Sequence, residues 1–309
     1  MSINWADRTG KPVFEVPKAD GRGMRAVNKN DAMKNGWLGR TTSILKVIAN
    51  WTIQEYQIEQ VLKWAYSNKP QPEDSEDDYV RHGKAGGMNH AGERARRGTE
   101  IHEEMEQWLN GITELKGAAT ESTFEPTDHV AKNVVKSLLM LFEEIGPKEI
   151  VSEYNFARPD LGYAGTCDIY LVDNQDRIWI IDLKNTKTDG MSKPYESWIW
   201  QLGAYFLALS KPEEDRKPPV FAQLVFDQDS GDGWEFWLTP TGKYRKGSED
   251  HVCYFNAGTE DNCLTVEIPG VYLYTQEESE GGVRKFEKML GLWKDLIGYD
   301  PAEWEGGES

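Results

Sequence analysis

The most restrictive feature of this sequence is a set of three short β-rich runs placed next to each other, at 150–157, 165–172 and 177–183. Turn-forming residues separate them, first in 158–162 (RPDLG) and then in 173–176 (DNQD). The second turn predicts a hairpin in which the second and third runs pair side by side. The middle of the chain is therefore expected to form a β-sheet.

Helical periodicity surrounds these runs on both sides. Apolar residues recur at helical spacing in 41–66, 91–110, 127–145, 195–210 and 283–297. Two more strands are expected at 220–227 and 234–238, whereas the polar segment 67–90 is expected to be a mobile loop. Together these elements predict an α+β fold, with a central mixed β-sheet flanked by helices and a helical N-terminal region.

Changes in composition and hydrophobic pattern divide the chain into three segments. Residues 1–90 are expected to form an N-terminal arm, a helix and the mobile loop, and residues 91–226 hold most of the predicted sheet with its helices. Residues 227–309 read as an acidic extension with some β character, a C-terminal helix and a polar tail.

The net charge of the chain is −17, from 35 Lys and Arg against 52 Asp and Glu. Such a balance disfavours tight binding to nucleic acid, because Lys and Arg neutralise phosphates. The charge is uneven, however: residues 1–66 carry ten basic and six acidic residues, and residues 211–309 carry ten and twenty-one. A basic groove can therefore coexist with an acidic exterior, and a bound cation would offset some carboxylates.

Other features limit the cellular setting and the cofactors. The three cysteines are widely spaced, which favours a reducing, cytoplasmic compartment and predicts neither a zinc site nor a disulfide framework. No apolar run reaches the roughly 20 residues that a membrane helix needs, and the N-terminus lacks a signal-peptide pattern. A phosphate-binding G-x-x-x-x-G-K-[ST] motif is also missing, so no use of ATP is expected.

Two aspartates and a lysine are expected at adjoining ends of the paired runs. Asp168 lies in the second run, and Asp182 and Lys184 end the third. Neighbouring carboxylates repel each other unless they share a cation, and their oxygens suit Mg²⁺ or Mn²⁺. Residues 182 and 184 of a strand point to the same face, so the lysine is expected beside the cation. This set can hydrolyse a phosphodiester, with the lysine stabilising the charge that develops.

Glu153 precedes Asp168 by fifteen residues, and Asp168 precedes Asp182 by fourteen. Glu153 is either a further carboxylate of the metal site or a solvated strand residue. A D-x-K tripeptide alone is more often an edge charge pair, so the prediction depends on these carboxylates occurring together.

His102 lies at the edge of the apolar face of the helix 91–110. It is either a metal ligand or, as is more common for a lone histidine, a hydrogen-bonded and partly buried residue. The start of this helix favours phosphate, although its arginines are also consistent with an ordinary solvated face. The candidates for DNA contact there are Arg94, Arg96, Arg97, Gly98 and Thr99.

Gln201 and Tyr205 lie one turn apart on the helix 195–210. Their amide and hydroxyl groups can hydrogen-bond a phosphate or hold Lys184. By themselves they are more consistent with a packed helix that has a polar edge.

In their order along the chain, these residues resemble the motifs of the PD-(D/E)xK superfamily of nucleases, in its RecB-like exonuclease branch. The motifs G-x-x-x-H, a Glu, G-x-x-D, D-x-K and Q-x-x-x-Y occur here as Gly98…His102, Glu153, Gly165…Asp168, Asp182-Leu-Lys184 and Gln201…Tyr205. The match spans about residues 95–210. The segment 40–45 (RTTSIL) also resembles phage-type and mitochondrial genome-maintenance exonucleases of this branch.

The resemblance implies a restriction-endonuclease-like fold with its nuclease core in residues 91–226. It implies that the metal ligands are His102, Asp168, Asp182 and the Leu183 carbonyl. It further implies that Lys184 is catalytic and that the site is completed by Glu153, Gln201 and Tyr205. Some relatives carry an iron–sulfur cluster held by four cysteines, which three scattered cysteines cannot supply.

These residues leave three functions open. The first is a Mg²⁺- or Mn²⁺-dependent DNA exonuclease that acts on free, single-stranded ends in the cytoplasm of a bacterial or phage-infected cell. Its setting would be recombination, repair or replication, with a separate helicase, single-strand-binding or recombination protein as partner. The second is a structure-specific or restriction-type endonuclease on the same core, and the third is a catalytically silent DNA-binding scaffold subunit.

Overall fold

The computed structural model describes residues 4–18, 21–71, 75–188, 191, 194–209, 220–234, 254–256, 263–265, 268–274 and 276–304. A mixed sheet of eight strands organises the chain, in the order β14-β11-β10-β9-β5-β1-β2, with β8 pairing along β9. Its strands are β1 (Trp5–Ala6), β2 (Pro12–Val13), β5 (Leu38–Arg40), β8 (Glu149–Arg158), β9 (Tyr163–Val172), β10 (Ile178–Thr186), β11 (Val220–Asp227) and β14 (Val271–Leu273). Smaller two-stranded pairs are β3 (Glu15–Pro17) with β4 (Met24–Ala26), β6 (Ile112–Glu114) with β7 (Glu121–Ser122), and β12 (Tyr254–Asn256) with β13 (Cys263–Thr265).

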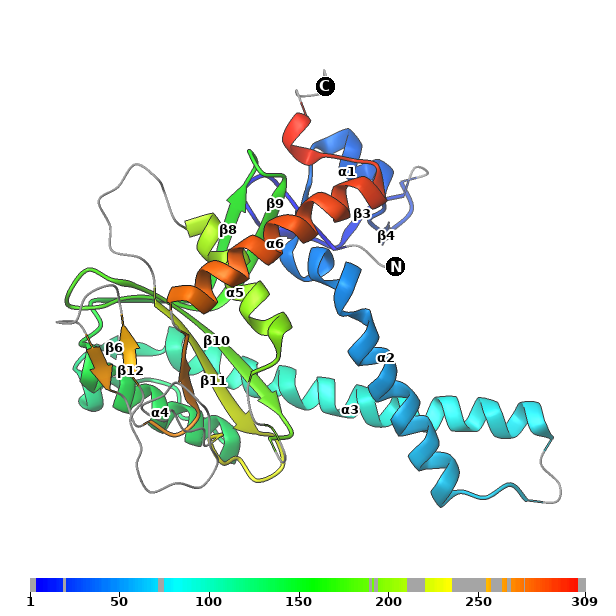
Figure 1. Cartoon of the computed structure of the whole chain (residues 1–309), viewed down its shortest axis with the longest axis horizontal. Helices are drawn as coiled ribbons and strands as arrows, with labels where there is room; N and C mark the ends of the chain where they lie inside the picture. Colours follow the sequence, from blue (N-terminus) through cyan, green and yellow to red (C-terminus); the bar gives the residue numbers. More distant parts are fainter. Residues whose placement is uncertain are drawn as a thin grey trace.

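Helices cover both faces of this sheet (Figure 1). The helices are α1 (Lys29–Asn35), α2 (Thr41–Ser67), α3 (Glu76–Asn110), α4 (His129–Ile145), α5 (Glu196–Leu209) and α6 (Gln276–Ile297). One core lies between the sheet and the helices α3 and α4, and a second lies between the opposite face and α2, α5 and α6. This arrangement confirms the predicted α+β class with a mixed sheet flanked by helices.

The three β-rich runs are confirmed as β8, β9 and β10. Along one edge of β9, β8 pairs antiparallel over almost the full length of both strands. Along the other edge, β5 pairs with Tyr163 and Ala164, and β10 pairs with residues 169–172. Among the described strands, none pairs with residues 165–168 on that second edge. The pairing along this edge of β9 is therefore interrupted between β5 and β10, and we call this interruption the opening.

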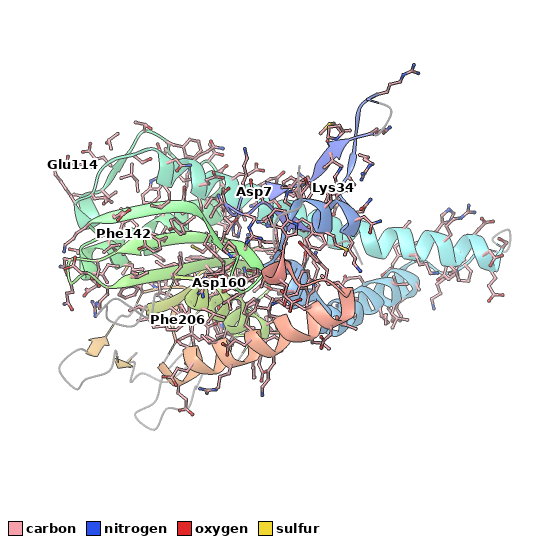
Figure 2. The ribbon with its side chains drawn as sticks, turned by 90° about the horizontal axis from the view of Figure 1, so that it is seen from above. Asp7, Lys34, Glu114, Phe142, Asp160 and Phe206 are labelled. Carbon is pink, nitrogen blue, oxygen red and sulfur yellow. The ribbon has the colours of Figure 1, made fainter. Side chains whose placement is uncertain are left out.

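The prediction of a loop across 67–90 is wrong for most of its length, because α3 begins at Glu76 rather than near residue 91. The Ser75 hydroxyl caps this helix by accepting the N–H of Asp78. Glycine in this segment allows close helix packing: a Cβ on Gly86 would lie 2.3 Å from the Trp64 ring of α2. As a result, α2 and α3 form a long hairpin that projects from the sheet (Figures 1 and 2).

The C-terminal extension joins the main sheet through β14 and covers it with α6. This helix begins at Gln276, two turns before the predicted start at residue 283. The strand expected at 234–238 falls on residues that, apart from Trp234, lie outside the described part of the chain. Trp304, in the segment expected to be a polar tail, lies under the Arg8 guanidinium. Within the described residues, no helix is both long and apolar enough to cross a bilayer.

Candidate metal centre and active site

Asp168 lies beside the opening in the sheet, where β9 is irregular. Cys167 and Ile169 belong to the cores on opposite faces, although residues two apart share a face in a regular strand. The adjacent residue of β8, Glu153, has a φ of +47° and is left out of the β8–β9 pairing. A positive φ is costly for a residue other than glycine and is common at functional sites. The irregularity turns the two carboxylates out of the regular ladder.

The sequence predicted Asp168 at the end of its strand, whereas it lies in the interior of β9. The pairing of β9 with β10 nevertheless ends at this residue. The last paired residues are Ile169 and Ile181, immediately before the two aspartates. Beyond this point, the Asp168 side chain replaces a backbone carbonyl as the acceptor for β10, since its Oδ2 accepts the N–H of Leu183 at 2.7 Å. This bond fixes the carboxylate beside the end of β10.

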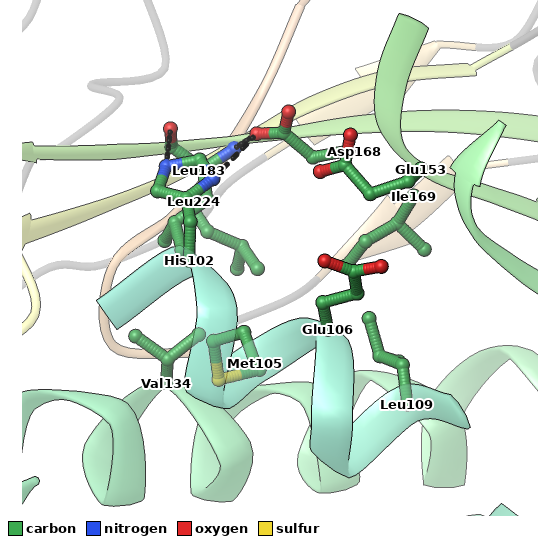
Figure 3. A pocket seen from close by; sticks show the side chains of 10 residues that line it. All are labelled: His102, Met105, Glu106, Leu109, Val134, Glu153, Asp168, Ile169, Leu183 and Leu224. Carbon is green, nitrogen blue, oxygen red and sulfur yellow. Dashed lines mark hydrogen bonds and ion pairs between the residues drawn. The ribbon is translucent and has the colours of Figure 1, made fainter. Parts of the chain in front are cut away.

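His102, Glu153 and Asp168 converge at this point (Figure 3). One side-chain ligand atom from each lies within 4.8 Å of the other two. His102 Nδ1 lies 3.7 Å from Asp168 Oδ2, and its Nε2 lies 3.2 Å from the Leu183 carbonyl oxygen. These residues line a cavity of about 20 Å³, which has room for one water-sized species.

The two carboxyl groups of this cluster have perturbed pKa values. Burial, together with the negative charge of Asp182, raises the pKa of Asp168 to about 6. Burial and the charges of Asp168 and Glu106 raise the pKa of Glu153 to about 7. Ionised carboxylates are therefore unfavourable here unless positive charge compensates them.

Glu106 was not predicted from the sequence, although it lines the same cavity and its carboxylate points towards Glu153 (Figure 3). It follows His102 by four residues on α3, so both side chains lie on one face of the helix. This spacing is the signal that would have identified it. A glutamate one turn after a candidate histidine ligand belongs to the same surface.

Asp182 and Lys184 lie on the opposite face of β10 from the α3 core and are held by α5 and β11. Lys184 Nζ lies 2.6 Å from Asp182 Oδ2, as expected for residues two apart on a strand. Asp182 is fully buried. The structure does not bring its carboxylate into the His102–Glu153–Asp168 cluster, although its charge acts on Asp168.

Gln201 links the predicted residues of α5 to this pair. Its Oε1 accepts from Lys184 Nζ at 3.1 Å, and its Nε2 donates to Asp182 Oδ1 at 3.1 Å. Gln201 Nε2 also donates to the hydroxyl of Tyr205. The structure therefore brings Gln201 to Lys184, and Tyr205 to Gln201. A third contact was missed: Gln223 on β11 donates through Nε2 to Asp182 Oδ2 at 3.0 Å.

The arginines predicted to contact DNA lie on α3, and each is engaged by a carboxylate. Arg97 pairs with Asp128 at 2.5 Å, Arg96 with Glu100, and Arg94 with Asp229 at 3.8 Å. Asp128 also caps α4, so the Arg97 contact ties α3 to α4. These pairings fit the structural alternative better than a free basic surface.

Gly98 and Thr99 occupy the same turns of α3. Gly98 faces open space, since a Cβ there would meet nothing within 4 Å. The Thr99 hydroxyl donates to the Ala95 carbonyl, which is an ordinary contact within a helix. Open space beside Gly98 is compatible with the close approach of a ligand.

Two further polar residues, neither of them a predicted site residue, lie near the ends of β5 and β10. Arg40 is the last residue of β5, directly before α2, and donates to the Thr166 hydroxyl at 3.1 Å, and its charge acts on Glu153. Asn185 follows Lys184, and both of its side-chain amide atoms are buried without a hydrogen-bond partner among the described residues. Buried amides are normally paired, so Asn185 is a candidate for contact with substrate.

The donor atoms of this centre fit a divalent cation. One imidazole, two carboxylates of raised pKa and a backbone carbonyl converge from α3, β8, β9 and β10. Carboxylate and carbonyl oxygens suit Mg²⁺ and Mn²⁺, and the imidazole suits Mn²⁺ as well. Lys184, held by Asp182 and Gln201, is near enough for its charge to act on Asp168. Such a set can hydrolyse an ester of phosphoric acid.

Comparison with known protein families gives an independent result. Residues 61–261 match a family described as the PD-(D/E)XK nuclease superfamily. The match covers more than half of the chain and includes every residue of the cluster and of the Asp182–Lys184 pair. No significant match is found among curated proteins.

Proposed function

Because the chain belongs to the PD-(D/E)XK nuclease superfamily, we propose that it is a Mg²⁺- or Mn²⁺-dependent DNA exonuclease of the RecB-like branch. The observation that carries this proposal is the convergence of His102, Glu153 and Asp168 within 4.8 Å of one another, beside the Leu183 carbonyl. The adjoining Lys184 supplies the positive charge that such a reaction needs.

His102, Glu153, Asp168 and the Leu183 carbonyl, which lie together in the structure, would hold the cation. The family resemblance adds Asp182 to these ligands, although its carboxylate lies outside their cluster. When bound, the cation supplies Lewis-acid chemistry and a nucleophile at neutral pH. Lys184 holds its ammonium next to Asp182, where it stabilises negative charge on the phosphate. Gln201 orients that ammonium through Oε1, and Tyr205 in turn supports Gln201.

We assign the substrate as DNA with a free end, in single-stranded form. The opening between β5 and β10 is bordered by Arg40, whose guanidinium can bind a phosphate. The cellular setting that fits this activity is recombination, repair or replication in the cytoplasm of a bacterial or phage-infected cell. A separate helicase, single-strand-binding or recombination protein would supply the free end.

The proposal is tested by digestion of end-labelled DNA. Single- and double-stranded substrates, linear and circular, are incubated with Mg²⁺, Mn²⁺ or EDTA. We expect linear single strands to be degraded only with a cation, and circles to be spared. Opened circles would indicate an endonuclease, and intact DNA in every reaction would indicate a scaffold subunit.

Variants connect this activity to the site. We expect Asp182→Ala and Lys184→Ala to lower cleavage by about 10²–10³-fold or more, as expected when a group that stabilises the transition state is lost. His102→Ala should lower it at least about tenfold. Two exposed residues provide matched controls, Lys187→Ala and His129→Ala. Wild-type activity in His102→Ala would show that His102 is only a packing residue.

A further inference from the structure

We propose that Gln223 and Tyr274 position the carboxylate of Asp182, so that the C-terminal extension contributes to the active site. The inference rests on the proposed function, in which Asp182 is a ligand of the cation. Neither residue belongs to the motifs recognised in the sequence.

Gln223 is the direct neighbour of Asp182 in the sheet. The two residues are register partners in the parallel pairing of β10 and β11. Gln223 is fully buried, and its Nε2 donates to Asp182 Oδ2 at 3.0 Å. Because Gln201 donates to Oδ1 of the same carboxylate, an amide from each side holds the two oxygens of Asp182. The carboxylate is therefore clamped between α5 and β11.

The clamp works only with one orientation of the Gln223 amide. The NH₂ group stabilises a carboxylate, whereas the carbonyl oxygen in its place would be repelled. The hydroxyl of Tyr274 donates to Gln223 Oε1 and so favours the orientation that directs Nε2 to Asp182. Tyr274 thus acts on Asp182 through Gln223.

The edge of the sheet fixes Tyr274 in turn. Tyr274 directly follows β14, its N–H donates to the Phe221 carbonyl at 3.0 Å, and its side chain is buried. Both ends of this hydrogen-bonded chain are therefore rigid. The extension, which has no motif of its own, supplies a hydroxyl two hydrogen bonds away from Asp182.

Loss of this support should change the behaviour of both Asp182 and Lys184. Gln223 and Lys184 share Asp182 Oδ2. Without Gln223, Lys184 is the only remaining partner of that oxygen. The ion pair between them then makes the carboxylate less available to a cation and the ammonium less available to substrate. Partners that orient a metal ligand typically contribute about 10–100-fold to metal affinity or activity.

Three substitutions test the proposal in the full-length protein. Gln223→Met keeps the length of the side chain but cannot donate, and Tyr274→Phe removes only the hydroxyl. Tyr272→Phe is the matched control, because Tyr272, two residues earlier in β14, is also buried and its hydroxyl is bonded to Glu278 instead. Mn²⁺ affinity is measured by calorimetry, and cleavage of linear single-stranded DNA is measured over a range of Mn²⁺ concentrations.

We expect Gln223→Met to weaken Mn²⁺ binding about 10–100-fold. Tyr274→Phe should weaken it about threefold to tenfold, as expected for one lost hydrogen bond, and Tyr272→Phe should change it less than about twofold. The Gln223→Met/Tyr274→Phe double variant should be no weaker than Gln223→Met alone, because the hydroxyl acts through the amide. Saturating Mn²⁺ should restore most of the cleavage rate of Tyr274→Phe.

Three outcomes would overturn the proposal: Tyr274→Phe matching the Tyr272→Phe control, additive effects in the double variant, or a wild-type protein that binds no Mn²⁺. If Gln223→Met does not fold, the comparison of Mn²⁺ affinity between Tyr274→Phe and Tyr272→Phe is sufficient to test the proposal. A wild-type protein that binds Mn²⁺ but leaves all DNA intact would contradict the proposed function only, because the affinity differences would still test the positioning.

Discussion

At the scale of single residues, the raised pKa values of Asp168 and Glu153 make the centre sensitive to pH. The pKa is raised to about 6 for Asp168 and about 7 for Glu153, so the folded state holds these protons more tightly than the unfolded chain does. Without a cation, the stability contributed by these groups is present at low pH and is lost as the pH rises towards 7. A cation must displace the same protons, so its binding strengthens as the pH rises.

We therefore expect Mn²⁺ to raise the melting temperature more at pH 8 than at pH 5.5. In EDTA, Glu153→Gln should melt higher than wild type at pH 8 and close to it at pH 5.5, since the variant no longer buries an ionised carboxylate. Thermal melting followed by circular dichroism measures both effects. Glu149→Gln, an exposed position on the same strand, is the control. Equal shifts at both pH values would show that Glu153 does not titrate in the cluster.

At the scale of residues, the sequence predicts most members of the candidate site. It does not predict that Asp168 and the Asp182–Lys184 pair lie towards opposite faces of the sheet. Alternating patterns place Asp182 and Lys184 together, and the structure has them 2.6 Å apart. A regular strand, however, cannot predict that β9 changes its alternation at Asp168, opposite the positive φ of Glu153 on the neighbouring strand. Gln223 was missed because a single buried glutamine carries no pattern.

At the scale of secondary-structure elements, the glycines of the helices explain the main errors in the predicted boundaries. The glycine-bearing stretches 67–90 and 227–282 were expected to lie outside helices, yet α3 contains Gly86, and α6 contains Gly281 and Gly282. These glycines allow close contacts that only the folded chain reveals. A Cβ on Gly203 of α5, for example, would lie 2.4 Å from the backbone of Gly282. Local propensity disfavours glycine in a helix, and tertiary packing overrides it.

Two glycines of α3 allow a matched test of this explanation. Gly86→Val should destabilise the α2–α3 hairpin by about 1–3 kcal/mol, because its side chain would overlap the Trp64 ring. Gly92→Ala should stabilise the same helix by up to about 1 kcal/mol, since a Cβ there meets nothing within 4 Å. Amide hydrogen exchange of α2 and α3 measures both changes. The packing role of Gly86 would be contradicted if Gly86→Val did not make exchange faster, or if Gly92→Ala did make it faster.

At the scale of the whole molecule, one sheet contains strands from all three sequence segments. β1 and β5 come from residues 1–90, β8 to β11 from residues 91–226, and β14 from residues 227–309. The composition suggested these segments, but it could not show that their strands pair, because contacts between distant segments leave no local pattern. We propose that the three segments unfold together, as parts of one cooperative unit.

Trp293 of α6 is the residue on which this cooperation is most directly tested. Its side chain is fully buried, its ring lies 5.9 Å from that of Trp5, and a Cβ on Gly39 would lie 2.3 Å from it. Gly39 belongs to β5, which borders the opening beside Asp168. The C-terminal helix therefore supports one side of the candidate site through the N-terminal strands.

We expect Trp293→Ala to destabilise the protein by about 3–5 kcal/mol, because a large buried ring would leave a cavity. Leu296→Ala on the same helix, at a side chain that is 66% exposed, should cost less than about 0.5 kcal/mol. Urea unfolding followed by tryptophan fluorescence and by circular dichroism should give coincident single transitions in both variants. An early, separate transition in Trp293→Ala that leaves Mn²⁺ binding intact would show that the N-terminal strands are an independent unit. In that case the opening beside Asp168 would be shaped by β8, β9 and β10 alone, and β5 would be dispensable for the site.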